Sequence, residues 1–89
     1  MKCIRCLVEG RVQGVGFRYF VFRQARRFGI VGWVRNLDNG CVELQAAGEA
    51  DPMREFLDQV RTGPSFSYVS RVDVREVAAE EFDSFSIVR

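Results

Sequence analysis

Residues 10–18 read G-R-V-Q-G-V-G-F-R and separate two segments whose apolar residues repeat with different periods. Before this stretch, at residues 3–9, apolar and polar residues alternate, as in a strand with one buried face. After it, at residues 17–28, apolar residues recur every three or four positions, and Gly29 supplies a stop. The stretch is therefore predicted to be the loop that joins a first strand to a first helix.

A β-hairpin is predicted next along the chain. Residues 30–35 and 42–46 are both strand-like, and the second of them alternates apolar with polar side chains. Between them lies L-D-N-G at residues 37–40, and Asn-Gly is typical of a hairpin turn because it tolerates positive φ. We therefore expect these two strands to pair in an antiparallel manner.

A second helix and two further strands follow from the rest of the chain. Asp51 is the expected N-cap of this helix, Pro52 occupies its first position, and Gly-Pro at residues 63–64 ends it. Residues 68–77 are strand-like, but the phase of their valines changes, which predicts a bulge or frayed ends. Residues 82–89 are expected to contain a short last strand.

The order β-α-β-β-α-β predicts an α+β fold, a ferredoxin-like α/β sandwich. We expect an antiparallel sheet of four to five strands with both helices on one face, in a single domain over residues 1–89, because 89 residues suffice for one two-layer core. The predicted core residues are Ile4, Cys6 and Val8 in the first strand, Phe17, Phe20, Val21, Gln24 and Phe28 in the first helix, and Met53, Phe56, Leu57 and Val60 in the second.

The charge balance argues against partners that are chosen by bulk electrostatics. With 13 basic and 12 acidic residues the net charge is +1, so neither duplex nucleic acid nor an anionic membrane is an expected partner. No apolar run is long enough to span a membrane, and no signal-peptide core follows the first six residues, M-K-C-I-R-C. We expect a cytoplasmic protein, and a monomer because nothing in the sequence favours an oligomer.

The three cysteines are not expected to bind metal or to act as nucleophiles. They cannot all pair within one chain, which fits a reducing compartment. Cys3 and Cys6 form C-x-x-C, but residues three apart on a strand point to opposite faces, and the chain has no His. Cys41 follows the hairpin turn and is interpreted as an ordinary strand residue.

The glycine-rich loop is a candidate anion site. Gly10, Gly14 and Gly16 allow left-handed or crowded backbone, so that the loop amides and the N-terminus of the helix can surround an anion. Arg18, in the first turn of the helix, can cover the same anion with its planar guanidinium. The alternative is a tight connection with only a structural role.

Two nucleotide-binding motifs do not fit this loop. In G-x-x-x-x-G-K-[ST], Val15 and Gly16 would stand where the second Gly and the Lys belong. In G-x-G-x-x-G, Tyr19 would replace the third Gly. The ligand that remains is a single phosphoryl group.

Asn36 is the second candidate, at the end of G-W-V-R-N. The first and second strands are joined through a helix and therefore run parallel, so their C-terminal ends meet at one edge of the sheet. An amide there, beside the glycine loop, could hold a water in line with a phosphorus atom. The alternative is a residue that caps the hairpin turn.

Two long motifs resemble those of the acylphosphatase family. V-E-G-R-V-Q-G-V-G-F-R at residues 8–18 matches the signature [LIV]-x-G-x-V-Q-G-V-x-[FM]-R, and G-W-V-R-N-L-D-N-G-C-V-E-L-Q-A-A-G at residues 32–48 matches the second signature. The similarity extends over essentially the whole chain. It implies that Arg18 is the essential phosphate-binding arginine and Asn36 the residue that positions the attacking water. Loop amides would complete the phosphate cradle, and these belong to Gln13, Gly14, Val15, Gly16 and Phe17.

The resemblance implies an enzyme that hydrolyses the carboxyl–phosphate bond of small acyl phosphates, releasing inorganic phosphate, without a metal or cofactor. Three alternatives share parts of the pattern. An RNA-binding module would need aromatic residues on the third strand, C-V-E-L-Q-A-A, which has none. A phosphate- or carbamoyl-phosphate-binding module of a larger maturation protein would keep the same signatures, although the length of this chain favours a stand-alone domain. An interaction module with relic catalytic residues is disfavoured, because every signature position is intact.

Overall fold

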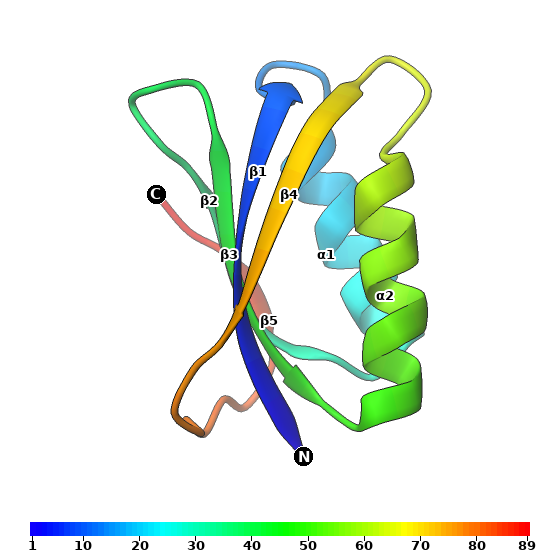
Figure 1. Ribbon diagram of the computed structural model, residues 1–89, viewed down its shortest axis with the longest axis vertical. Coiled ribbons are helices and arrows are strands. Elements are labelled where there is room, and N and C mark those ends of the chain that lie inside the picture. Colours follow the sequence, from blue (N-terminus) through cyan, green and yellow to red (C-terminus); the bar gives the residue numbers. More distant parts are fainter.

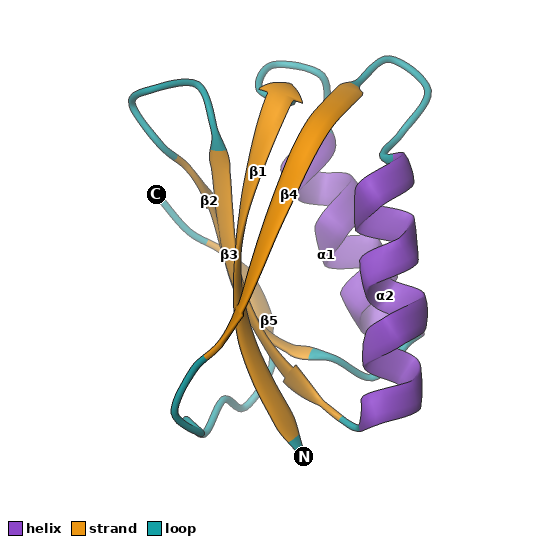
Figure 2. Ribbon diagram, viewed as in Figure 1, coloured by secondary structure: helices purple, strands orange, loops and turns teal.

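A five-stranded sheet with both helices against one face makes up the protein (Figures 1 and 2). The computed structural model describes residues 1–89. Its elements are β1 (Lys2–Arg11), α1 (Phe17–Arg27), β2 (Val31–Asn36), β3 (Val42–Gly48), α2 (Ala50–Thr62), β4 (Tyr68–Glu76) and β5 (Phe85–Ile87). The ferredoxin-like order β-α-β-β-α-β is confirmed, with β5 as a fifth strand. Neither helix is long and apolar enough to cross a membrane.

The sheet is mixed, so the expectation of a wholly antiparallel sheet is wrong for its last strand. The strand order is β4-β1-β3-β2-β5, and neighbouring strands are antiparallel except β2 and β5. β4 runs antiparallel to both β1 and β2. The chain then reverses below the sheet in Figure 1 and climbs beside β2, where Val34 pairs with Ile87 in parallel register. Because the chain crosses from the β4 edge to the opposite edge, β5 lies beside β2, which runs in the same direction.

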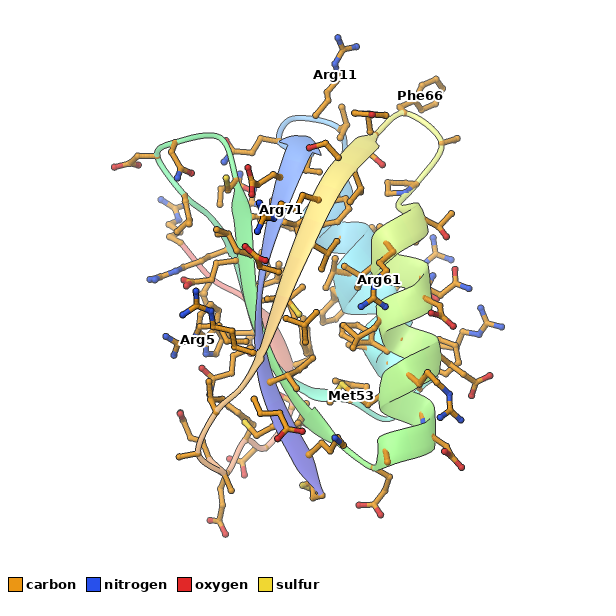
Figure 3. The ribbon with its side chains drawn as sticks, in the orientation of Figure 1. Arg5, Arg11, Met53, Arg61, Phe66 and Arg71 are labelled. Atoms are coloured by element: carbon orange, nitrogen blue, oxygen red, sulfur yellow. The ribbon has the colours of Figure 1, made fainter.

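The core lies between the sheet and the two helices. Phe17, Val21 and Ala25 of α1 are fully buried and lie four residues apart. The predicted Phe20, Gln24 and Phe28 are only half-buried. Ala25 was not predicted as a core residue, because its small side chain contributes little to the apolar pattern of the helix. The predicted residues of β1 and α2 are buried except Leu57, which packs partly against the core. Figure 3 shows Met53 between α2 and the sheet.

The second helix begins one residue before the predicted N-cap. Its N-cap is Glu49, with extended backbone at φ −70° and ψ 155°, so the assignment of Asp51 as the cap is wrong. Asp51 lies instead in the first turn, where its carboxylate is 3.0 Å from the guanidinium of Arg54. The predicted end is confirmed, since Gly63 is the C-cap.

The predicted irregularity in β4 is a bulge beside β1. Glu9 pairs with Arg71 but Gly10 pairs with Val69, so Ser70 is the extra residue. The bulge brings Val69 back into phase with Val72, and both pack against the core.

The β1–α1 loop and the β2–β3 turn lie at the same end of the molecule, at the top of Figure 1. This follows from the sheet, because β1 and β2 both pair antiparallel with β3 and are therefore parallel to each other. The two segments predicted to carry the site are thus brought together.

Candidate active site

A pocket of about 180 Å³ opens between the β1–α1 loop, the start of α1 and the end of β2. Four of the predicted loop and helix residues reach it together with Asn36, and β5 contributes its last residue. The lining residues are Val12, Gly14, Gly16, Phe17, Arg18, Tyr19, Asn36 and Ile87. The predicted proximity of the glycine loop and Asn36 is therefore confirmed.

The N-terminus of α1 is open toward a ligand. Its N-cap, Gly16, is left-handed at φ 77° and ψ 18°, and no side chain caps the helix. The first amides of a helix have no partner within the helix, and together they carry a partial positive charge. No acidic residue lies in the first turn to neutralise it. This end of the helix therefore favours an anion in the pocket.

The three loop glycines have different roles. Gly14 and Gly16 have φ of +75° and +77°, and a Cβ at either would meet no atom within 4 Å. A Cβ at Gly10, whose φ is +131°, would collide with the backbone carbonyl of Tyr68 on β4. Gly10 therefore serves the packing of the sheet, whereas Gly14 and Gly16 serve the left-handed backbone that shapes the pocket.

Arg18 supplies a positive charge without an internal partner. It is half-buried, lines the pocket, and takes part in none of the six ion pairs of the protein. It is also the only charged residue of the lining. Its guanidinium is therefore free to pair with an anion held at the helix N-terminus.

Asn36 lies on the helix-covered face of β2, two residues after the fully buried Val34. Its side-chain oxygen is enclosed and accepts no hydrogen bond. The adjoining turn is closed by other groups: the amide of Leu37 donates to the carbonyl of Cys41 at 2.9 Å, and the amide of Cys41 donates to Oδ1 of Asn39 at 3.0 Å. Asn36 therefore does not cap the turn, and its side chain is left to the pocket.

Two predicted loop residues lie outside the lining. The side chain of Gln13 turns away and donates to the backbone carbonyls of Leu37 and Cys41. Val15 packs against the hydrophobic core. That the amides of these two residues bind phosphate stays a prediction.

Comparisons with known proteins show the family to which the chain belongs. The sequence model of the Acylphosphatase family matches residues 4–87. The chain belongs to the acylphosphatase family. It is 44% identical to an acylphosphatase of Thermotoga maritima over 98% of this chain and 97% of that protein. The crystal structure of acylphosphatase from Bacillus subtilis superposes with a TM-score of 0.97 at 43% identity and full coverage of both chains.

A larger protein also contains this fold. Full-length HypF, in a phosphate- and nucleotide-bound form, matches 99% of this chain with a TM-score of 0.87 at 34% identity, but only 12% of the HypF chain is covered. The acylphosphatases of Thermotoga petrophila and Thermotoga maritima, in contrast, are each matched over 97% of their length.

Three pocket residues of this acylphosphatase were not predicted from the sequence: Val12, Tyr19 and Ile87. Tyr19 directly follows Arg18 and lies outside the apolar positions that α1 buries. This position could have indicated that Tyr19 lies near the site. Ile87 reaches the pocket only through the parallel pairing of β5 with β2, for which no local signal exists. Cys41 lies one residue before β3, so its interpretation as a strand residue is wrong; it is half-buried and does not line the pocket. No three His, Cys, Asp or Glu side chains gather as a metal-binding cluster.

Proposed function

We propose that this acylphosphatase hydrolyses the carboxyl–phosphate bond of small acyl phosphates, with Arg18 and the first amides of α1 holding the phosphoryl group and Asn36 holding the attacking water. One observation carries the proposal. An uncapped helix N-terminus, an arginine without an ion pair and an asparagine whose side-chain oxygen accepts no hydrogen bond line the same small pocket.

The positive groups act on the charge of the phosphoryl group. Phosphoryl transfer passes through a loose transition state in which charge spreads over three equatorial oxygens, so catalysis depends mainly on positioning and electrostatic stabilisation. The guanidinium of Arg18 can bond two of these oxygens, and the amides at Gly16 and Phe17 can face the rest.

Water is the nucleophile in this proposal. Its oxygen forms a bond to phosphorus while the bond from phosphorus to the carboxylate oxygen breaks, giving a carboxylate and inorganic phosphate. The amide of Asn36 orients the water opposite the leaving group, which makes the attack effectively intramolecular. We infer that the proton of the water passes to an oxygen of the phosphate, since no His, Asp or Glu lines the pocket as a base.

The leaving group explains why so few catalytic residues are required. A carboxylate leaves without protonation, so no general acid has to be placed beside it. We therefore propose a reaction that requires neither a metal nor a cofactor. We also propose that the protein acts as a monomer in the cytoplasm, to which its three unpaired cysteines are suited.

A second candidate function uses the same pocket for binding alone. This candidate is a phosphate- or carbamoyl-phosphate-binding module within a larger maturation protein. Its support is the likeness to HypF in a phosphate- and nucleotide-bound form, of which only 12% of the chain is covered. Turnover separates the two candidates, because a binding module releases no phosphate.

The test is the hydrolysis of benzoyl phosphate in the presence of EDTA. The native protein should hydrolyse benzoyl phosphate. Arg18→Ala and Asn36→Ala should each lower kcat/KM about 100-fold or more. Arg54→Ala, which removes an exposed arginine of α2, is the matched control and should keep full activity. Loss of native turnover with EDTA, or full activity of Asn36→Ala, would reject the mechanism.

A further inference from the structure

One side of the pocket is lined by apolar residues that have no role in binding the phosphoryl group. Arg18, Asn36 and the glycines account for its polar part, whereas Tyr19 and Ile87 add two large apolar surfaces. Both residues are exposed, Tyr19 by 59% and Ile87 by 42%, and both line this one pocket. They therefore present apolar surface to a group that extends beyond the phosphoryl site.

Tyr19 is held in place by its neighbours on α1. Its ring is stacked on that of Phe22, with centroids 6.1 Å apart and planes 22° apart, and the guanidinium of Arg23 lies 5.9 Å from its centroid. Stacking and cation–π contacts each restrict the ring. These contacts favour one orientation of the ring, in which Tyr19 presents its exposed surface beside Arg18.

Ile87 is fixed by the sheet. It pairs with Val34 in parallel register, and the amide of Val88 donates to the carbonyl of Val34 at 2.9 Å. Val34 lies two residues before Asn36 on β2. The pairing therefore places Ile87 beside the strand end that carries the proposed water-positioning residue.

We propose that Tyr19 and Ile87 form the subsite for the acyl group and that they favour acyl phosphates with a flat, apolar acyl group, such as an aryl group. This inference rests on the proposed function. With the phosphoryl group held at Arg18, the acyl group must extend along the remaining wall of the pocket. A ring placed there would cover exposed apolar surface on Tyr19 and Ile87.

The experiment compares benzoyl phosphate with acetyl phosphate, which has the same reacting bond and almost no acyl surface. For the native protein, kcat/KM should be higher with benzoyl phosphate. Tyr19→Ala and Ile87→Ala should each lower kcat/KM for benzoyl phosphate about 3- to 10-fold and change that for acetyl phosphate less than about 2-fold. Tyr19→Phe keeps the ring and should behave like the native protein.

Two controls separate the subsite from the phosphate cradle. Tyr68→Ala removes an equally exposed tyrosine, 67% exposed on β4 and outside the pocket, and should leave both substrates unaffected. The inhibition constant of inorganic phosphate should be unchanged in Tyr19→Ala and Ile87→Ala. Equal losses on both substrates, or no loss on either, would overturn the subsite while leaving the proposed function intact. No native turnover of either substrate would reject the proposed function itself and the subsite with it.

Discussion

The side-chain nitrogen of Gln13 lies 2.7 Å from the backbone oxygen of Leu37, so the glycine loop is tied to the turn that follows Asn36. The same nitrogen donates to the carbonyl of Cys41 at 2.8 Å, on the other side of the turn. Both of its hydrogens are thereby used. One amide group thus fixes the distance between the segment that carries Arg18 and the segment that carries Asn36.

Substituting Gln13 should loosen this link. Gln13→Ala removes two hydrogen bonds and should lower the free energy of unfolding by about 1 to 3 kcal/mol, with a loss of about 10-fold in kcat/KM as the two halves of the site separate. Gln13→Glu is the sharper variant. It has the same shape but presents an acceptor to two carbonyl oxygens, so it should be less stable than Gln13→Ala in urea denaturation. A stable Gln13→Glu protein would show that these two bonds contribute nothing.

Much of the fold could be predicted because its signals are local. The change of period across residues 10–18, the Asn-Gly turn and the Gly63 stop each fix an element without reference to the rest of the chain. The direction of β5 could not be predicted, because three residues carry no usable period and their partner, β2, lies about 50 residues earlier in the sequence. The cap of α2 was misplaced because Asp is a preferred N-cap residue, whereas the observed N-cap, Glu49, makes no side-chain cap hydrogen bond.

The candidate site divides in the same way. Arg18 and Asn36 could be placed together because one rule, the parallel course of two strands joined by a helix, puts both at one edge of the sheet. The bonds from Gln13 to the turn and the position of Ile87 depend on side-chain direction and on a distant strand pairing. No short stretch of the sequence indicates these hydrogen bonds or the position of Ile87.

The loop glycines should differ in their tolerance of a methyl group. Gly16→Ala adds a Cβ in open space, so its cost is the left-handed backbone alone, about 1 to 2 kcal/mol. Gly10→Ala adds a Cβ that collides with the carbonyl of Tyr68 and should cost more than about 3 kcal/mol. Denaturation in urea measures both. If both variants lost the same free energy of unfolding, β4 would have to shift to make room for the new Cβ at residue 10.

Stability should fall in alkaline solution because of Cys6. Burial raises the pKa of this thiol from 9.0 to about 12, against the opposing effect of the Arg61 charge. Above pH 9 the unfolded chain loses this proton while the folded chain keeps it, so unfolding becomes easier until about pH 12. The contribution is at most about 1.4 kcal/mol per pH unit. The free energy of unfolding of Cys6→Ala should fall less steeply over this range, and parallel curves for the two proteins would contradict the assignment.

Inorganic phosphate should stabilise the native protein if the cradle is formed as proposed. At ten times its dissociation constant, bound phosphate should raise the free energy of unfolding by about 1.4 kcal/mol, which a thermal melt detects. Arg18→Ala should lose this stabilisation at the same phosphate concentration, whereas Arg54→Ala should retain it. Equal stabilisation of Arg18→Ala would place the phosphate elsewhere.

Asn36→Ala should separate activity from stability. The side-chain oxygen of Asn36 accepts no hydrogen bond from the rest of the protein, so removing it breaks none within the fold. Asn36→Ala should therefore leave the free energy of unfolding nearly unchanged, while hydrolysis of benzoyl phosphate falls and phosphate still binds to Arg18. Val34→Ala, on the same face of β2, is the control and should lose about 1 to 3 kcal/mol by opening a cavity in the core. If Asn36→Ala were as unstable as Val34→Ala, Asn36 would be a structural residue, and the water would have to be positioned by another group.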